Sequence, residues 1–116
     1  MKPEFVGEGK GKYRTVNVAW ETNMVVDEAH PADNKPSHCG NNEYKHACDS
    51  LLFPMVQEFN PDIILISCGF DCAIHDPLGW CNVSPMMFAY MTHGLNKICP
   101  RLLVIQEGGY NTDFLG

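Results

Sequence analysis

The side chains of Asp71 and Tyr110 are the first candidates for chemistry, because each follows an aliphatic segment within a few residues. Asp71 is the last residue of the segment 67–71, which follows the aliphatic residues 63–66. Tyr110 follows a pair of glycines at residues 108–109. A carboxylate is a hard oxygen ligand suited to zinc or another divalent ion, and a phenol is neutral at pH 7 and donates one hydrogen bond. A phenol aimed at a carbonyl oxygen stabilises the oxyanion that forms there. A metal ion and a phenol together therefore suit the hydrolysis of an amide.

Each residue also has a plainer interpretation, and position alone favours it. Asp71 fits a loop aspartate that caps a turn, and Tyr110 fits a half-buried aromatic residue at the end of a strand. A shared site therefore depends on whether the fold brings the two side chains together.

Three strands are predicted from the pattern of apolar residues. Residues 63–67 and 102–105 are aliphatic runs typical of strands buried on both faces of a parallel sheet, and alternation over residues 14–20 indicates an earlier strand. With helices between them, the order strand, helix, strand, helix, strand predicts an α/β fold with an open parallel sheet. Such sheets place their sites just past the carboxyl ends of the strands, which is where Asp71 and Tyr110 lie.

Two helices are predicted between these strands. The first covers residues 43–59, with Pro54 expected to kink it or split it in two. The second begins at Ser84 and Pro85, a capping residue followed by proline at the first helical position, and ends before Pro100. Their inner faces are expected to carry Tyr44, Cys48, Leu51, Met55 and Phe59 on the first helix, and Met87, Met91, Leu95 and Ile98 on the second.

Composition excludes several classes of protein. The 116 residues provide room for one domain, and eight Lys plus Arg against fourteen Asp plus Glu give a net charge of −6. An acidic chain is poorly suited to direct nucleic-acid binding. No apolar run approaches the roughly 18 residues that span a membrane, and the N-terminus carries no secretory signal. The six cysteines contain no C-x-x-C pair and are interpreted as free thiols.

Several short segments resemble, in this order, the C-terminal part of the catalytic domain of class II histone deacetylases, in particular the tubulin-deacetylase-like IIb branch. Any one of them is weak evidence, but together they are specific. The segments are Gly9-Lys10-Gly11 before Val16-Asn17-Val18-Ala19-Trp20, Glu58-Phe59-Asn60-Pro61-Asp62, Ser67-Cys68-Gly69-Phe70-Asp71, Asp76-Pro77-Leu78-Gly79, Val83-Ser84-Pro85 and Glu107-Gly108-Gly109-Tyr110-Asn111.

The resemblance implies roles for particular residues. Asp71 matches the last of three ligands to a catalytic Zn²⁺ ion, and Tyr110 matches the tyrosine that polarises the acetyl carbonyl and holds the oxyanion. Leu78 matches a residue at the mouth of the acetyl-lysine channel, and Gly108 and Gly109 match the backbone beside the pocket.

The resemblance also implies a fold and an activity. The family has an arginase-like α/β domain and removes acetyl groups from lysine side chains with one zinc ion. The expected substrates are acetylated lysines in histone tails or in cytoplasmic proteins such as tubulin, in the cytoplasm, the nucleus or both, with no direct partner in nucleic acid or membrane.

The chain departs from the family in what it lacks. The other two zinc ligands and the general-base histidines of the family precede this region, and none of the five histidines here has their sequence context. Residues 1–116 are therefore expected to be a partial catalytic domain, with a loop insertion at residues 21–42, and to be inactive in isolation.

Three alternatives remain open at this point. The chain could be a non-catalytic fragment or binding module, or part of an acetylpolyamine amidohydrolase, because the same pocket accepts a small acetylated amine. It could also be a small zinc-binding protein that uses cysteines from the set Cys39, Cys48, Cys68 and Cys72 with His38 or His75.

Overall fold

The computed structural model describes residues 4–20 and 39–115. Most of the predicted loop at residues 21–42 lies outside the described residues. In chain order the elements are a 3₁₀ turn η1 (Gly9–Gly11), α1 (Asn41–Ala47), a π-helical segment η3 (Cys48–Leu52), α2 (Phe53–Phe59), β1 (Ile64–Cys68), α3 (Pro85–Ile98), β2 (Leu102–Gln106) and a short α4 (Thr112–Leu115).

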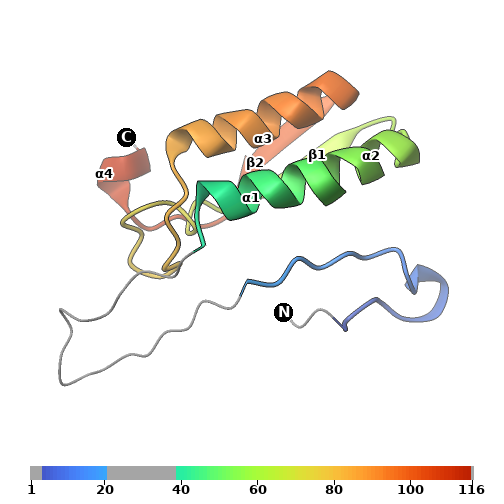
Figure 1. The fold of residues 1–116 in the computed structure, drawn as a ribbon, viewed down its shortest axis with the longest axis horizontal. Helices are drawn as coiled ribbons and strands as arrows, with labels where there is room; N and C mark the ends of the chain where they lie inside the picture. The colour runs from blue at the N-terminus through green and yellow to red at the C-terminus, as the bar shows by residue number, and fades with distance from the viewer. Residues whose placement is uncertain (1–3, 21–38, 116) are drawn as a thin grey trace.

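The strands β1 and β2 pair in parallel, with α3 connecting them (Figure 1). Ile64 lies opposite Leu102, and the register continues without a bulge to Cys68 opposite Gln106. The two strands therefore end at the same edge of the sheet. This arrangement confirms the predicted α/β fold with a parallel open sheet.

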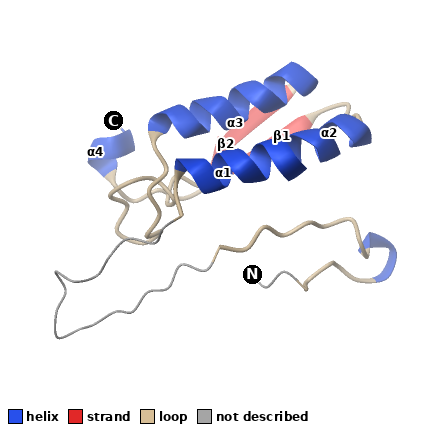
Figure 2. Ribbon diagram, in the orientation of Figure 1, coloured by secondary structure: helices blue, strands red, loops and turns tan. Residues whose placement is uncertain are grey.

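In the described part of the chain, helices cover only one face of this sheet. Figure 2 shows α1, α2 and α3 on the same side of the two strands. Burial alternates along β1, and Leu65 on the uncovered face is 63% exposed. Leu103 and Ile105 of β2 are exposed as well. The prediction that both strands are buried on both faces is therefore wrong for the described residues, because these residues place no helix on the second face.

The helical run from α1 through η3 to α2 accommodates Pro54 without a break (Figure 1). Proline lacks an N–H, and its ring clashes with the carbonyl one helical turn earlier. The π-helical turn precedes it: the Phe53 N–H donates to the Cys48 carbonyl, five residues back. This wider turn relieves the clash, so of the two expected outcomes, a kink or a split, the split does not occur. The helix begins at Asn41, where the Gly40 N–H donates to Glu43 Oε2 at 2.8 Å.

The same wide turn shifts the apolar face of the helix. Tyr44 and Cys48 lie on the packed side as predicted, but Leu51 and Phe59 are exposed. Leu52 and Phe53 pack against the core in their place. A π turn holds one more residue than an α turn, so positions beyond it rotate away from the 3.6-residue period that predicted them.

Helix α3 begins at Pro85 after Ser84, as predicted, and its expected inner face is confirmed, with Met87 and Leu95 buried. The Ser84 side chain makes no capping hydrogen bond within its own helix. Instead, Asn41 Nδ2 donates to Ser84 Oγ and the Ser84 N–H donates to Asn41 Oδ1, each at 2.9 Å. This reciprocal pair joins the starts of α1 and α3.

The best-buried residues belong to the loop between β1 and α3. Val83 is fully buried and Ala73 nearly so, and these two residues form an isolated parallel β-bridge. A second bridge joins Gly40 to Asn82, and Phe70 packs edge-on against Phe88 with 5.0 Å between ring centroids. The loop that carries Asp71 is therefore anchored in the core.

The predicted strand at residues 14–20 does not form. A strand needs a neighbour for its hydrogen bonds, and no described segment forms a ladder with this one. The segment docks through aromatic packing instead, with the Trp20 and Tyr44 ring centroids 5.4 Å apart. Among the described residues, no helix is long and apolar enough to cross a membrane.

Candidate functional site

Asp71 lies in a tight turn just past the carboxyl end of β1. The Ala73 N–H donates to the Phe70 carbonyl at 3.0 Å, which closes the turn around Asp71. Gly79 packs directly on the Asp71 backbone, and a Cβ at Gly79 would fall 1.5 Å from the Asp71 carbonyl oxygen. A Cβ at Gly69 would fall 2.9 Å from Asp71 Oδ1. Both glycines are therefore needed for Asp71 to occupy this position.

Tyr110 follows the carboxyl end of β2 through a glycine pair. The Glu107 N–H donates to the Cys68 carbonyl at 3.0 Å, so the two segments of the chain stay paired one residue beyond the strands. Gly108 and Gly109 then adopt positive φ angles of 91° and 99°, a region that disfavours residues with a Cβ. This turn leads to Tyr110, a residue that is 54% exposed.

The side chains of Asp71 and Tyr110 approach the same point. A Cβ built on Gly108 would lie 3.6 Å from Tyr110 Oη and 3.9 Å from Asp71 Oδ2. The two strands are neighbours, and the loops that follow them meet at one edge, as the topology predicted. The absence of a side chain at Gly108 leaves the space between the carboxylate and the phenol open. The chemical roles of these residues stay a prediction.

Asp76 joins the two loops, and sequence reasoning did not assign it a role. Its Oδ2 accepts a hydrogen bond from the Tyr110 N–H at 2.7 Å. Its Oδ1 accepts from the Leu78 N–H at 2.8 Å and the Gly79 N–H at 3.1 Å. Aspartate followed by proline and a glycine is a common turn signal, which could have indicated the local contacts but not the bond to Tyr110.

The environment of Asp76 favours its charged form. Asp76 is only 8% exposed. Burial by itself raises the pKa of a carboxyl, but hydrogen bonds from the backbone N–H groups of Tyr110, Leu78, Gly79 and Asn111 outweigh burial, and the pKa of Asp76 lies below its usual value. Asp76 is therefore a buried carboxylate that is held by backbone N–H donors.

Leu78 and His75 lie at the periphery of these loops. Leu78 is 61% exposed, on the turn whose next residue packs against Asp71. His75 is exposed at a positive φ of 67°, and its carbonyl accepts a hydrogen bond from Asn111 Nδ2 at 3.0 Å. His75 is therefore a surface residue beside these loops.

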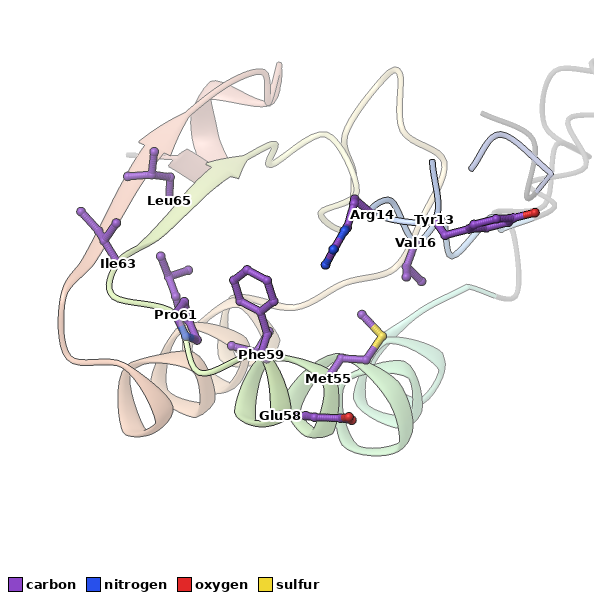
Figure 3. A pocket seen from close by; sticks show the side chains of 11 residues that line it. Tyr13, Arg14, Val16, Met55, Glu58, Phe59, Pro61, Ile63 and Leu65 are labelled. Atoms are coloured by element: carbon purple, nitrogen blue, oxygen red, sulfur yellow. The ribbon is translucent and has the colours of Figure 1, made fainter. Parts of the chain in front are cut away.

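An open groove lies elsewhere on the molecule (Figure 3). Tyr13, Arg14 and Val16 line one side, and residues of α2, the following turn and the start of β1, among them Phe59 and Ile63, line the rest. The groove lies at the amino end of β1, whereas Asp71 follows the carboxyl end. It is therefore separate from the space between Asp71 and Tyr110.

Comparison with known protein families decides the classification of the chain. The histone deacetylase domain matches residues 2–116, nearly the whole sequence. The chain belongs to the histone deacetylase domain family. This match and the relatives below confirm the resemblance to class II histone deacetylases that the sequence motifs indicated.

Relatives of this deacetylase-family chain come from distant organisms. It is 38% identical to histone deacetylase HDA1 of Candida albicans over 109 residues, and 36% identical to polyamine deacetylase HDAC10 of Danio rerio over 112 residues. These alignments cover 93% and 96% of this chain but 11% and 14% of the relatives. The crystal structure of the HDA15 HD domain superposes with a TM-score of 0.82 at 34% identity, over 98% of this chain and 29% of that chain. The deacetylase-family chain therefore spans a small part of the proteins it matches.

The family is zinc-dependent, and the residues present here can be tested for a zinc site. A catalytic zinc needs three protein ligands. Among residues 4–20 and 39–115, no group of three His, Cys, Asp or Glu side chains is placed to hold a metal ion. The Asp71 carboxylate is a suitable donor, but the described residues do not form a complete zinc site. The alternative of a small zinc-binding protein built on Cys39, Cys48, Cys68 or Cys72 gains no support from the described residues, while His38 lies outside them.

Proposed function

We propose that this chain forms the part of a protein lysine deacetylase active site that carries the oxyanion-binding phenol and one zinc ligand. The observation that supports the proposal is the approach of Asp71 Oδ2 and Tyr110 Oη to one point beside Gly108. A carboxylate and a phenol that face a common space can act on one acetyl group. Membership of the histone deacetylase family supports the choice of acetyl-lysine over other amides.

Tyr110 acts on the acetyl carbonyl oxygen in this proposal. The phenol donates a hydrogen bond to that oxygen, and the bond strengthens as negative charge develops. Gly108 and Gly109 have no side chains, so the acyl group can approach the backbone beside Tyr110. Loss of one such donor typically lowers the rate by on the order of 10²-fold or more.

Asp71 supplies one oxygen donor to zinc in this proposal. Because the described residues do not form a complete zinc site, the other donors come from outside the described residues in this proposal. The sequence context of the five histidines supports the expectation that the isolated 116 residues are inactive. The role of a non-catalytic binding module remains the alternative for the chain in isolation.

The proposed substrates are acetylated lysine side chains in histones or in other proteins such as tubulin, encountered in the cytoplasm, the nucleus or both. Leu78, exposed on the loop beside Asp71, would contact the substrate at the mouth of the channel. A second candidate substrate is an acetylated polyamine, because one of the relatives is a polyamine deacetylase.

The test is a chimera in which residues 1–116 replace the matching segment of the HDA15 HD domain, onto which they superpose. We expect stoichiometric zinc and hydrolysis of an acetyl-lysine peptide. Tyr110→Phe should retain zinc and lose about 10²-fold or more in kcat. Asp71→Ala should lose both zinc and activity.

The matched control is Tyr13→Phe, which removes a phenol from an exposed residue at the other end of β1. It should leave the rate unchanged. A folded chimera with full zinc occupancy and no turnover would refute the proposal. Preference for acetylspermidine over the peptide would favour the second candidate.

A further inference from the structure

Asp76 differs from the other acidic residues of the described part of the chain because it is buried. Its two carboxylate oxygens also accept hydrogen bonds from different loops. Oδ2 accepts from the Tyr110 N–H at 2.7 Å, in the loop after β2. Oδ1 accepts from the Leu78 and Gly79 N–H groups, in the loop after β1. One carboxylate therefore spans the two loops that carry the candidate site.

The hydrogen bond from the Tyr110 N–H to Asp76 restrains the backbone directly after a flexible glycine pair. Tyr110 follows Gly108 and Gly109, two residues with wide conformational freedom that the structure places at positive φ. A glycine pair alone cannot hold the next Cα, and hence its side chain, in one direction. The Asp76 carboxylate holds the N–H of Tyr110 itself, so it fixes the point from which the phenol extends.

The bonds to the other loop extend this control to Asp71. Asp76 Oδ1 holds the N–H of Gly79, and Gly79 packs on the carbonyl of Asp71 with no room for a side chain. A further hydrogen bond joins the two loops, from Asn111 Nδ2 to the His75 carbonyl at 3.0 Å. The carboxylate of Asp76 thus links the backbone positions of Asp71 and Tyr110 through one rigid group.

We infer that Asp76 is a positioning residue, which sets the direction of the Tyr110 phenol relative to Asp71 without touching the substrate. The inference rests on the proposed function, because positioning has a catalytic meaning only if Tyr110 binds the acetyl oxygen. The carboxylate is needed because both oxygens act as acceptors. An asparagine side chain has one acceptor oxygen, and its NH₂ group would face an N–H donor on the other side.

The first experiment addresses the geometry alone, in the full 116-residue chain. In the native chain the Tyr110 and Gly79 amides should be protected from hydrogen exchange, measured by NMR. Asp76→Asn should lower the protection of at least one of them by about 10-fold or more, since one side loses its acceptor. The control Asp62→Asn removes an exposed carboxylate near Arg101 and should leave both amides unchanged. Equal protection in Asp76→Asn and native chains would overturn the inference, whatever the activity.

The second experiment addresses catalysis, in the HDA15 chimera that carries residues 1–116. Asp76→Asn should lower kcat by about 10- to 100-fold with zinc content retained and KM within about 2-fold, because a misplaced catalytic group acts mainly on the transition state. In a Tyr110→Phe background, Asp76→Asn should change kcat by less than about 2-fold, since the hydroxyl that it positions is already absent.

Failure of the proposed function and failure of the inference about Asp76 give different results. An inactive parent chimera would count against the proposed function, while the exchange measurement would still decide the geometry. An active chimera in which Asp76→Asn and Tyr110→Phe reduce kcat independently would show that Asp76 acts through general stability, and that result would overturn the inference. Asp76→Glu, with the same charge and a longer side chain, should remain as impaired as Asp76→Asn if position is what matters.

Discussion

Gly79 lies against the carbonyl group of Asp71, so close that a Cβ on the glycine would fall 1.5 Å from the Asp71 oxygen and 2.3 Å from the Asp71 carbonyl carbon. No side chain fits in that space, and both contacting atoms belong to the backbone. The position of Asp71 therefore depends on a residue that carries no functional group.

Gly79→Ala is expected to displace the Asp71 turn and to lower the free energy of unfolding by about 1–3 kcal/mol or more, the usual cost of overpacking. Urea denaturation of the full chain measures this. Gly11→Ala is the matched control, because a Cβ at Gly11 meets no atom within 4 Å. Equal stability of the two variants would contradict the close contact at Gly79.

Gly94→Ala tests the packing of α3 on α2. Alanine is favoured over glycine in a helix by about 1 kcal/mol. A Cβ at Gly94, however, would lie 2.3 Å from Cζ of Phe53, and moving a packed ring costs about 1–3 kcal/mol. We expect a net loss of stability in denaturant titration. In a Phe53→Ala background the same change should become stabilising, and a loss of equal size there would show that the ring is not the cause.

The pKa of Asp76 predicts a dependence of stability on pH. Burial raises this pKa, but the backbone N–H donors lower it further, so the folded value lies below the ordinary value of 3.8. The stabilisation is therefore present above about pH 4 and is lost as the pH falls through the folded pKa. The difference in Tm between the native chain and Asp76→Asn should be large near neutral pH and should narrow in acid. A difference that stays constant with pH would argue against a paired carboxylate.

The reactivity of Cys39 is expected to be low in the folded chain. Burial, and next the neighbouring Cys81 thiol, raise the pKa of Cys39 to about 12. At about pH 8 only a fraction on the order of 10⁻⁴ would then be thiolate, the reactive form. Differential alkylation followed by mass spectrometry should find Cys39 among the slowest cysteines in native buffer, and all six labelled in concentrated guanidinium chloride. Fast native labelling of Cys39 would show that its surroundings are open.

The parts of the fold that follow from local pattern could be predicted from the sequence. The aliphatic runs gave the positions of β1 and β2, and Ser84 with Pro85 gave the start of α3. The approach of Asp71 and Tyr110 to a common point followed from the rule that parallel strands end at one edge. These features depend on short stretches of sequence or on topology alone.

The rest depends on contacts between distant segments. The segment at residues 14–20 alternates like a strand but has no described neighbour to pair with. The π turn before Pro54 moved the packed face from Leu51 to Leu52 and Phe53, which a regular 3.6-residue period cannot anticipate. The local sequence predicts only a turn at Asp76. The structure adds the hydrogen bond from the Tyr110 N–H to the second carboxylate oxygen of Asp76.

The uninterrupted register of β1 and β2 has a consequence for how the chain tolerates insertions and deletions. Cys68 opposite Gln106 sets the point from which both loops leave the sheet. One residue added to or removed from β2 would carry Tyr110 about 3.3 Å along the strand and reverse the side toward which each strand residue faces. Segment length between Leu102 and Tyr110 is thus under as strict a constraint as amino-acid identity. A length variant here would separate phenol from carboxylate even if every side chain were kept.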